Sequence, residues 1–224
     1  MPLFAFEGRF PEIAPTAFVH PDSVLTGDVR IGPHCYVGPG ASLRGDFGRV
    51  VVGEGANIQD NCVLHCFPER EVRVGADGHV GHGAVLHGCR VGRGALVGMN
   101  AVVMDDAELG ERAVLGAGCM VPASMVIPAR HLAVGVPARI LRELTPDELG
   151  WKARGTATYQ ELAARCLTGL TAVPPGSGPP GGAGPADGDA GWKHVPLHDH
   201  RAESSAAGER TTSAPSDARG RNRG

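Results

Sequence analysis

Apolar side chains recur every six residues through the first half of the chain. Fresh runs of this repeat begin at Val19, Val52, Val74 and Val91. A glycine often follows the apolar residue, and Ala, Ser or Cys often stands four positions after it. No α-helix has a six-residue period, and simple strand alternation would not place glycine at one fixed phase. The aliphatic positions are Val19, Leu25, Ile31, Val37, Leu43, Val52, Ile58, Leu64, Val74, Val80, Leu86, Val91, Val97, Val103, Leu109, Leu115 and Val121.

This pattern predicts an all-β solenoid rather than a glycine-rich sandwich of short strands. Each repeat supplies one short strand and one turn, and three repeats close a triangular coil with the aliphatic side chains inside. Strands of successive coils would lie about 4.8 Å apart. Extra residues interrupt the period within 44–49 and near 66–70, and the step from Leu86 to Val91 is one residue short. Segments that leave a solenoid usually carry function, so we expect loops at the two insertions.

Helix signals follow where the repeat fades after Val121. Thr145-Pro146-Asp147-Glu148 is typical of a capping box with proline at the first helical position, and Thr158–Glu161 is typical of a second. We expect one broken or two short helices over 146–169, interrupted near Gly155, covering the open end of the solenoid or a neighbouring subunit. The predicted domains are a solenoid over 1–140, a helical segment over 141–170 and a disordered Pro/Gly-rich tail over 171–224.

Composition narrows the class of protein. The 224 residues include 34 Gly and 18 Pro but only 4% aromatic residues, which argues against a packed helical bundle. A net charge of −3 offers no overall basic field for nucleic acid or an anionic membrane. No apolar run approaches the roughly 18 residues of a spanning helix. Because the six cysteines form no CxxC pair and no secretory signal is visible, we expect reduced, mostly buried thiols in a cytoplasmic protein.

The repeat places histidines on neighbouring coils. On one face, the residue after the aliphatic position is Arg44, then His65, then His87. His65 and His87 therefore share an outward column at a spacing that one metal ion can bridge. His82 lies in another column, across a corner, and a three-fold oligomer would bring it to the pair of a neighbouring subunit. The alternative is that all three are surface histidines in glycine-rich turns.

Three histidines with an open fourth position are typical of catalytic zinc, and Co²⁺ or Fe²⁺ also accepts three imidazoles. Two polar pairs lie beside this predicted site. Arg44 and Asp46 form either an ordinary surface ion pair or a contact that positions the interface. Gln59 and Asp60 either satisfy their own turn or hydrogen-bond a metal-bound water.

Several motifs together resemble the γ-class carbonic anhydrase family over about residues 10–170. They are the six-residue repeats, RGD at Arg44–Asp46, NIQDN at Asn57–Asn61, His65, and GHGAVLHGC at Gly81–Cys89. The resemblance implies a trimeric left-handed parallel β-helix with a C-terminal helix. It also implies metal ligands at His65, His87 and the adjacent subunit's His82, with Arg44, Asp46, Gln59 and Asp60 around them.

Within that family, segments such as GPGASLRGDFGR and GTATYQELAARC resemble proteins of phenylacetate degradation, with carnitine-operon proteins second. Tyr159 matches a recurrent position near the site of that group. Phe47 stands where well-studied γ-class enzymes carry a proton-exporting glutamate, which argues against fast CO₂ hydration. Phe47 and Phe67 would instead form an apolar rim for a larger substrate. Cys66 is either an extra soft ligand or a small buried thiol.

Four functions remain open at this point. In the first, a metal-bound hydroxide hydrolyses an acyl-CoA thioester, with Gln59 and Asp60 orienting it and Tyr159 donating to the oxyanion. In the second, the same hydroxide hydrates CO₂. The third is an acyltransferase, whose histidine base needs no metal, and the fourth is a trimeric scaffold with a structural zinc.

Overall fold

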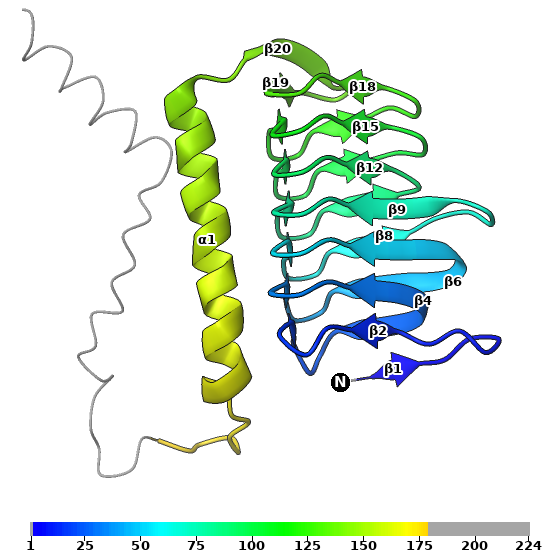
Figure 1. Cartoon of the computed structure of the whole chain (residues 1–224), viewed down its shortest axis with the longest axis vertical. Helices are drawn as coiled ribbons and strands as arrows, with labels where there is room; N and C mark the ends of the chain where they lie inside the picture. Colours follow the sequence, from blue (N-terminus) through cyan, green and yellow to red (C-terminus); the bar gives the residue numbers. More distant parts are fainter. Residues whose placement is uncertain (1, 179–224) are drawn as a thin grey trace, which may run out of the picture. The chain divides into compact units, whose positions relative to one another are not determined.

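The computed structural model describes residues 2–178, which form a parallel β-solenoid followed by one helix (Figure 1). The predicted solenoid of six-residue repeats is confirmed, whereas its left-handed coiling and trimeric assembly stay predictions. Most of the predicted tail, 179–224, lies outside the described residues. In the part of the chain that the structure describes, no helix is long and apolar enough to cross a membrane.

Two faces of the solenoid belong to one sheet because two long strands turn a corner between them. These strands are β4 (Val24–Ile31) and β6 (Ser42–Val52), which pair in parallel along their length. The first halves of β4 and β6 lie on one face of the solenoid. The other strands of that face are β1 (Leu3–Phe4), β8 (Val63–His65), β11 (Val85–His87), β14 (Val102–Val103) and β17 (Met120–Val121). The second halves of β4 and β6 lie on the next face. The other strands of that face are β2 (Glu12–Ile13), β9 (Glu71–Val74), β12 (Arg90–Val91), β15 (Glu108–Leu109) and β18 (Val126–Ile127).

The third face is a separate eight-stranded sheet. Its parallel strands are β3 (Phe18–Val19), β5 (Tyr36–Val37), β7 (Asn57–Ile58), β10 (His79–Val80), β13 (Leu96–Val97), β16 (Val114–Leu115) and β19 (His131–Val134). The last strand, β20 (Arg139–Glu143), pairs antiparallel with β19 and ends the sheet.

Three positions of the six-residue unit have different structural roles. One points into the core, one turns the chain, and one lies against the next coil. In most repeats the residue three after the inward aliphatic adopts positive φ, as Asn61 (58°) and Gly94 (61°) do, and Asn and Gly enter this region at low cost. The glycine after the aliphatic lets coils approach closely, because a Cβ on Gly53 would lie 2.7 Å from the backbone nitrogen of Ala76. These demands explain why glycine recurs at fixed phases.

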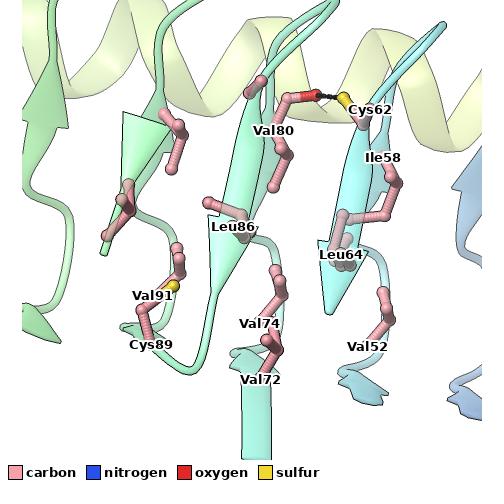
Figure 2. Packing of buried hydrophobic residues seen from close by; sticks show 14 of the residues in the cluster. Val52, Ile58, Cys62, Leu64, Val72, Val74, Val80, Leu86, Cys89 and Val91 are labelled. Atoms are coloured by element: carbon pink, nitrogen blue, oxygen red, sulfur yellow. Dashed lines mark hydrogen bonds between the residues drawn. The ribbon is translucent and has the colours of Figure 1, made fainter. Parts of the chain in front are cut away.

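The core is a set of aliphatic stacks that run from coil to coil. Leu64 and Leu86 are fully buried neighbours on one face, and Figure 2 shows this stack beside those of the other two faces. The Cys62 thiol fills a corner and donates to the carbonyl oxygen of Gly81 at 3.2 Å. Burial of each such aliphatic side chain contributes roughly 1.5–3 kcal/mol.

The two insertions behave differently. The prediction of a loop at 44–49 is wrong, because these residues extend β6 and Arg44 pairs in register with Thr26 of β4. Pairing satisfies the backbone groups that a loop would have exposed. The second insertion is a turn after β8, where Glu69 has positive φ and Phe67 is exposed.

The C-terminal segment is one helix, α1 (Pro146–Gly169), which begins with the expected capping box of Thr145 and Glu148. The predicted break at Gly155 is wrong. The helix continues because buried Lys152, Thr156 and Ala163 lie on the side that packs on the solenoid. The alternative that the helix covers the open end of the solenoid is also wrong, because α1 runs along its side against β3, β5 and β7 (Figure 1). The other alternative, contact with a neighbouring subunit, stays a prediction.

All six cysteines are free thiols, and five are buried, which confirms the prediction of mostly buried thiols. Burial raises the pKa of Cys35 and of Cys89 to about 12 and that of Cys62 to about 11. Since only thiolates react readily, these thiols should be inert in the folded protein.

We therefore expect that the folded protein at pH 8 exposes at most one thiol, Cys166, to a disulfide reagent such as DTNB within minutes. All six should react once the chain is unfolded. A Cys166→Ser variant is the control and should lose the fast reaction altogether. Rapid reaction of two or more thiols in the folded protein would contradict the burial of the other five thiols.

Candidate metal centre

His65 and His87 lie side by side on adjacent coils. They end strands β8 and β11, which pair in parallel with His87 directly opposite His65. Nδ1 of His65 lies 3.3 Å from Nε2 of His87, and the ring centroids are 5.3 Å apart. The outward column that the repeat predicts therefore brings these two imidazoles together.

In each of these two histidines, the ring nitrogen that points away from the other histidine contacts a carboxylate. Oδ1 of Asp46 lies 3.1 Å from Nε2 of His65, and Oδ1 of Asp105 lies 2.7 Å from Nδ1 of His87. In the tautomer of each ring that donates its N–H to the carboxylate on that side, the other ring nitrogen is a lone-pair acceptor. Two acceptor nitrogens then face one another, and a cation between them is the natural partner.

The geometry of this pair fits a tetrahedral metal ion. With metal–nitrogen bonds of about 2.0–2.1 Å, two ligands of a tetrahedral ion are about 3.3–3.4 Å apart, which agrees with the 3.3 Å between the facing nitrogens. Burial, with the nearby Arg44 guanidinium second, lowers the pKa of His65 and favours its neutral form. Among the described residues of this single chain, no group of three or more His, Cys, Asp or Glu could hold a metal.

His82 stands apart from the pair. It follows β10, on the third face of the solenoid, and its side chain is 45% exposed. Oδ2 of Asp60 lies 3.0 Å from its Nδ1, and the Tyr159 hydroxyl lies 3.5 Å from its Nε2. His82 thus repeats the carboxylate–histidine arrangement, with Nε2 directed toward Tyr159.

Gln59 is buried in a polar cluster beneath α1. Its Nε2 donates to Oδ1 of Asn57 at 3.0 Å and lies 2.7 Å from Nε2 of His79. Its Oε1 accepts the backbone N–H of His82 at 3.2 Å. The structure therefore gives Gln59 the role of fixing the turn that carries His82, and the sequence reasoning did not identify Asn57 or His79.

Tyr159 connects α1 to this cluster. Its ring packs on Tyr36 and edge-on to His79, with centroids 5.3 and 5.4 Å apart. Burial, reinforced by Tyr36, raises the pKa of Tyr159 to about 12. The phenol therefore stays protonated at neutral pH and can donate a hydrogen bond.

Two exposed phenylalanines flank the histidine pair. Phe47 packs against His65 with centroids 5.4 Å apart, and Phe67 packs edge-on against His87 at 4.8 Å. The two residues are 51% and 56% exposed, so the predicted apolar rim does lie beside these imidazoles. Arg44 reaches Asp46 at 3.1 Å from the same edge.

Two further residues lie beside the histidine pair: Asp105 contacts His87, and Cys66 follows His65 in the chain. No sequence motif pointed to Asp105, although it stands two residues after Val103, the next aliphatic position along the same column. The Cys66 thiol is buried and donates toward the carbonyl oxygens of Arg49 and Arg70 at 3.6 and 3.4 Å. Its contacts fit a structural thiol rather than a metal ligand.

Comparison with known proteins agrees with this architecture. The family model described as Bacterial transferase hexapeptide (six repeats) matches residues 10–45 and 88–123. The carnitine operon protein CaiE of Salmonella newport is 51% identical over 175 residues, which cover 78% of this chain and 88% of that protein.

Two solved structures share the fold. The product of the BC4754 gene of Bacillus cereus has a TM-score of 0.72 at 34% identity and covers 72% of this chain and 94% of that one. A hexapeptide transferase family protein of Anaplasma phagocytophilum has a TM-score of 0.70 at 34% identity and covers 72% and 96%. The repeats, the fold and the similarity to CaiE together show that this chain belongs to the hexapeptide-repeat transferase family.

Proposed function

We propose that this protein is a metal-dependent acyl-CoA thioesterase that works as a homotrimer with its metal between subunits. The observation that carries the proposal is the pair of facing nitrogens of His65 and His87, each imidazole backed by a carboxylate. The resemblance to the γ-class carbonic anhydrases supports a metal here. Within that family, the closer resemblance to the phenylacetate-degradation protein PaaY supports a thioester from phenylacetate breakdown as the substrate.

The third ligand in this proposal is His82 of the partner subunit. His82 is half exposed on one face and is held by Asp60, while the His65–His87 pair lies on a different face. A three-fold assembly sets one face of each subunit against another face of its neighbour. Such a contact would complete a three-histidine site that a single chain does not form.

A bound Zn²⁺, Co²⁺ or Fe²⁺ would supply a water nucleophile at neutral pH and polarise the thioester carbonyl. The residues of this chain hold and orient the reactants around it. Asp46 and Asp105 fix the ring orientation of His65 and His87. The protonated Tyr159 hydroxyl, 3.5 Å from His82, would donate to the carbonyl oxygen as negative charge develops there.

The reaction consumes one water and releases a carboxylic acid and the CoA thiol. Phe47 and Phe67 would contact the acyl group, since both rings are exposed beside the histidines. An apolar rim of this size suits an aromatic or long acyl chain better than CO₂. Hydration of CO₂ remains the alternative for the same ligands, although Phe47 replaces the glutamate that exports protons in well-studied relatives.

A second candidate is acyl transfer from CoA to a small acceptor. The family model and the Anaplasma phagocytophilum relative both carry the name transferase, which favours this reaction. Transfer through a histidine base needs no metal. Sensitivity to a chelator therefore separates the two candidates.

The deciding experiment measures CoA-thiol release by metal-verified protein from aromatic and aliphatic acyl-CoAs, with CO₂ hydration measured in parallel. We expect release from aromatic thioesters that a chelator abolishes and Zn²⁺ or Co²⁺ restores, with slow hydration. Fast hydration without CoA release would make the protein a carbonic anhydrase. Chelator-resistant activity that requires an acyl acceptor would favour the transferase.

The interface site predicts complementation between two inactive variants. His82→Ala and His65→Ala should each lose bound metal and activity, because each removes one ligand from every site. Unfolding and refolding them together at equal amounts should restore about a quarter of the sites, since each mixed trimer contains one intact contact. Three metal ions per trimer in His82→Ala, or no recovery after mixing, would contradict a shared site.

The carboxylate behind His87 should tune the metal affinity. Asp105→Asn keeps the shape of the side chain but weakens the acceptor for the His87 N–H. We expect the affinity for Zn²⁺ to fall about 10–100-fold, measured by competition with a coloured chelator. Asp106→Asn is the matched control, because Asp106 pairs with Arg70 at the surface, and it should bind metal as the wild type does.

A further inference from the structure

A cavity of about 530 Å³ lies between α1 and a corner of the solenoid, apart from the histidine pair. Its lining includes Asp77, Arg93, Gly94, Arg112, Lys152 and Gln160. Asp77, Gly94 and Arg112 occupy equivalent turn positions on three successive coils, as the bonds of Gly94 N to Ala76 O and Arg112 N to Arg93 O indicate. Because the middle position is glycine, space opens there in front of Lys152.

The cavity contains more positive than negative charge. Lys152, Arg93 and Arg112 line it, and Asp77 is the acidic residue of that lining. Both oxygens of Asp77 already have partners, since Oδ1 accepts from Gln160 Nε2 at 3.1 Å and Oδ2 lies 3.4 Å from Arg93. Glu111 approaches Arg112 to 3.6 Å in an exposed pair, which contributes little.

Lys152 is the unusual member of this group. It is only 5% exposed, and its ammonium donates to the backbone oxygen of Asp77 at 2.6 Å. Burial, with Arg112 acting in the same direction and Asp77 against it, lowers the pKa of Lys152 to about 8. A buried cation beside two arginines is costly unless an anion joins it.

The cavity and the proposed catalytic site share helix α1. Gln160 lines the cavity, and the preceding residue, Tyr159, contacts His82. Lys152 and Tyr159 are seven residues apart, or about 10 Å along the helix. A ligand with an anionic end and a long linear arm would therefore reach from the cavity toward the metal ligands.

We infer that this cavity binds the phosphate groups of the CoA part of the substrate. Lys152 and Arg112 would donate to phosphate oxygens, while the pantetheine arm runs beside α1 toward Tyr159. The identity of the ligand rests on the proposed function. The capacity for a phosphate-bearing ligand rests on the charges and the cavity alone.

The test titrates the full-length protein with adenosine 3′,5′-bisphosphate, the phosphorylated end of CoA, by calorimetry, with inorganic phosphate in parallel. Lys152→Met and Arg112→Gln should each weaken binding of the bisphosphate about tenfold or more, since each removes a charged hydrogen-bond donor. Arg154→Gln changes an exposed residue of the same helix outside the cavity and should bind as the wild type does.

Kinetics supply the second measurement. Lys152→Met should raise KM for the acyl-CoA about tenfold, and should raise KM for the thioester of the same acyl group with pantetheine, which lacks the phosphates, much less. Equal losses on both substrates would overturn the inference. So would unchanged bisphosphate affinity in Lys152→Met and Arg112→Gln, or bisphosphate binding no tighter than inorganic phosphate.

Failure of the proposed function gives a different result. His87→Ala should abolish turnover and still bind the bisphosphate with wild-type affinity. Absence of chelator-sensitive CoA release together with Lys152-dependent bisphosphate binding would refute the thioesterase and support the phosphate site.

Discussion

Backbone hydrogen bonding between successive coils is the constraint on which the rest of the molecule depends. Bonds such as Gly38 N to Ile58 O and Gly53 N to Val74 O, both 2.8 Å, tie each coil to the next in one register. A slip of one residue would turn every inward aliphatic outward, so the core enforces that register. The spacing of His65 and His87 is thus maintained by the same interactions that stabilise the fold.

Much of this architecture follows from the six-residue repeat, which is visible in the sequence. Inward aliphatics, small residues and turn glycines recur at fixed phases, and the neighbouring column of His65 and His87 follows by arithmetic from that period. The extension of β6 through Arg44 did not follow, because it depends on pairing with β4. The continuity of α1 through Gly155 depends likewise on packing against another part of the chain, which overrides local helix propensity.

The polar surroundings of the site were less predictable, for a reason that differs between residues. Asp105 could be placed by following the column one coil beyond His87, since Val103 continues the aliphatic stack. The contacts of Gln59 with Asn57 and His79 depend on side-chain rotamers inside a buried cluster, which spacing alone does not determine. The side chain of His82 is partly exposed in the single chain, as is expected of a residue whose proposed partners belong to another subunit.

Helix α1 also changes how the solenoid would be expected to come apart. Repeat arrays usually gain their stability from contacts between neighbouring units, so their ends can fray independently. Here Lys152 bonds to the backbone of Asp77 and Gln160 to that of Gly55, contacts that span 75 and 105 residues. Strands β3, β5 and β7 are held by the same helix. The helix thereby couples coils that would otherwise melt one at a time, and it gives a modular array the cooperativity of a globular domain.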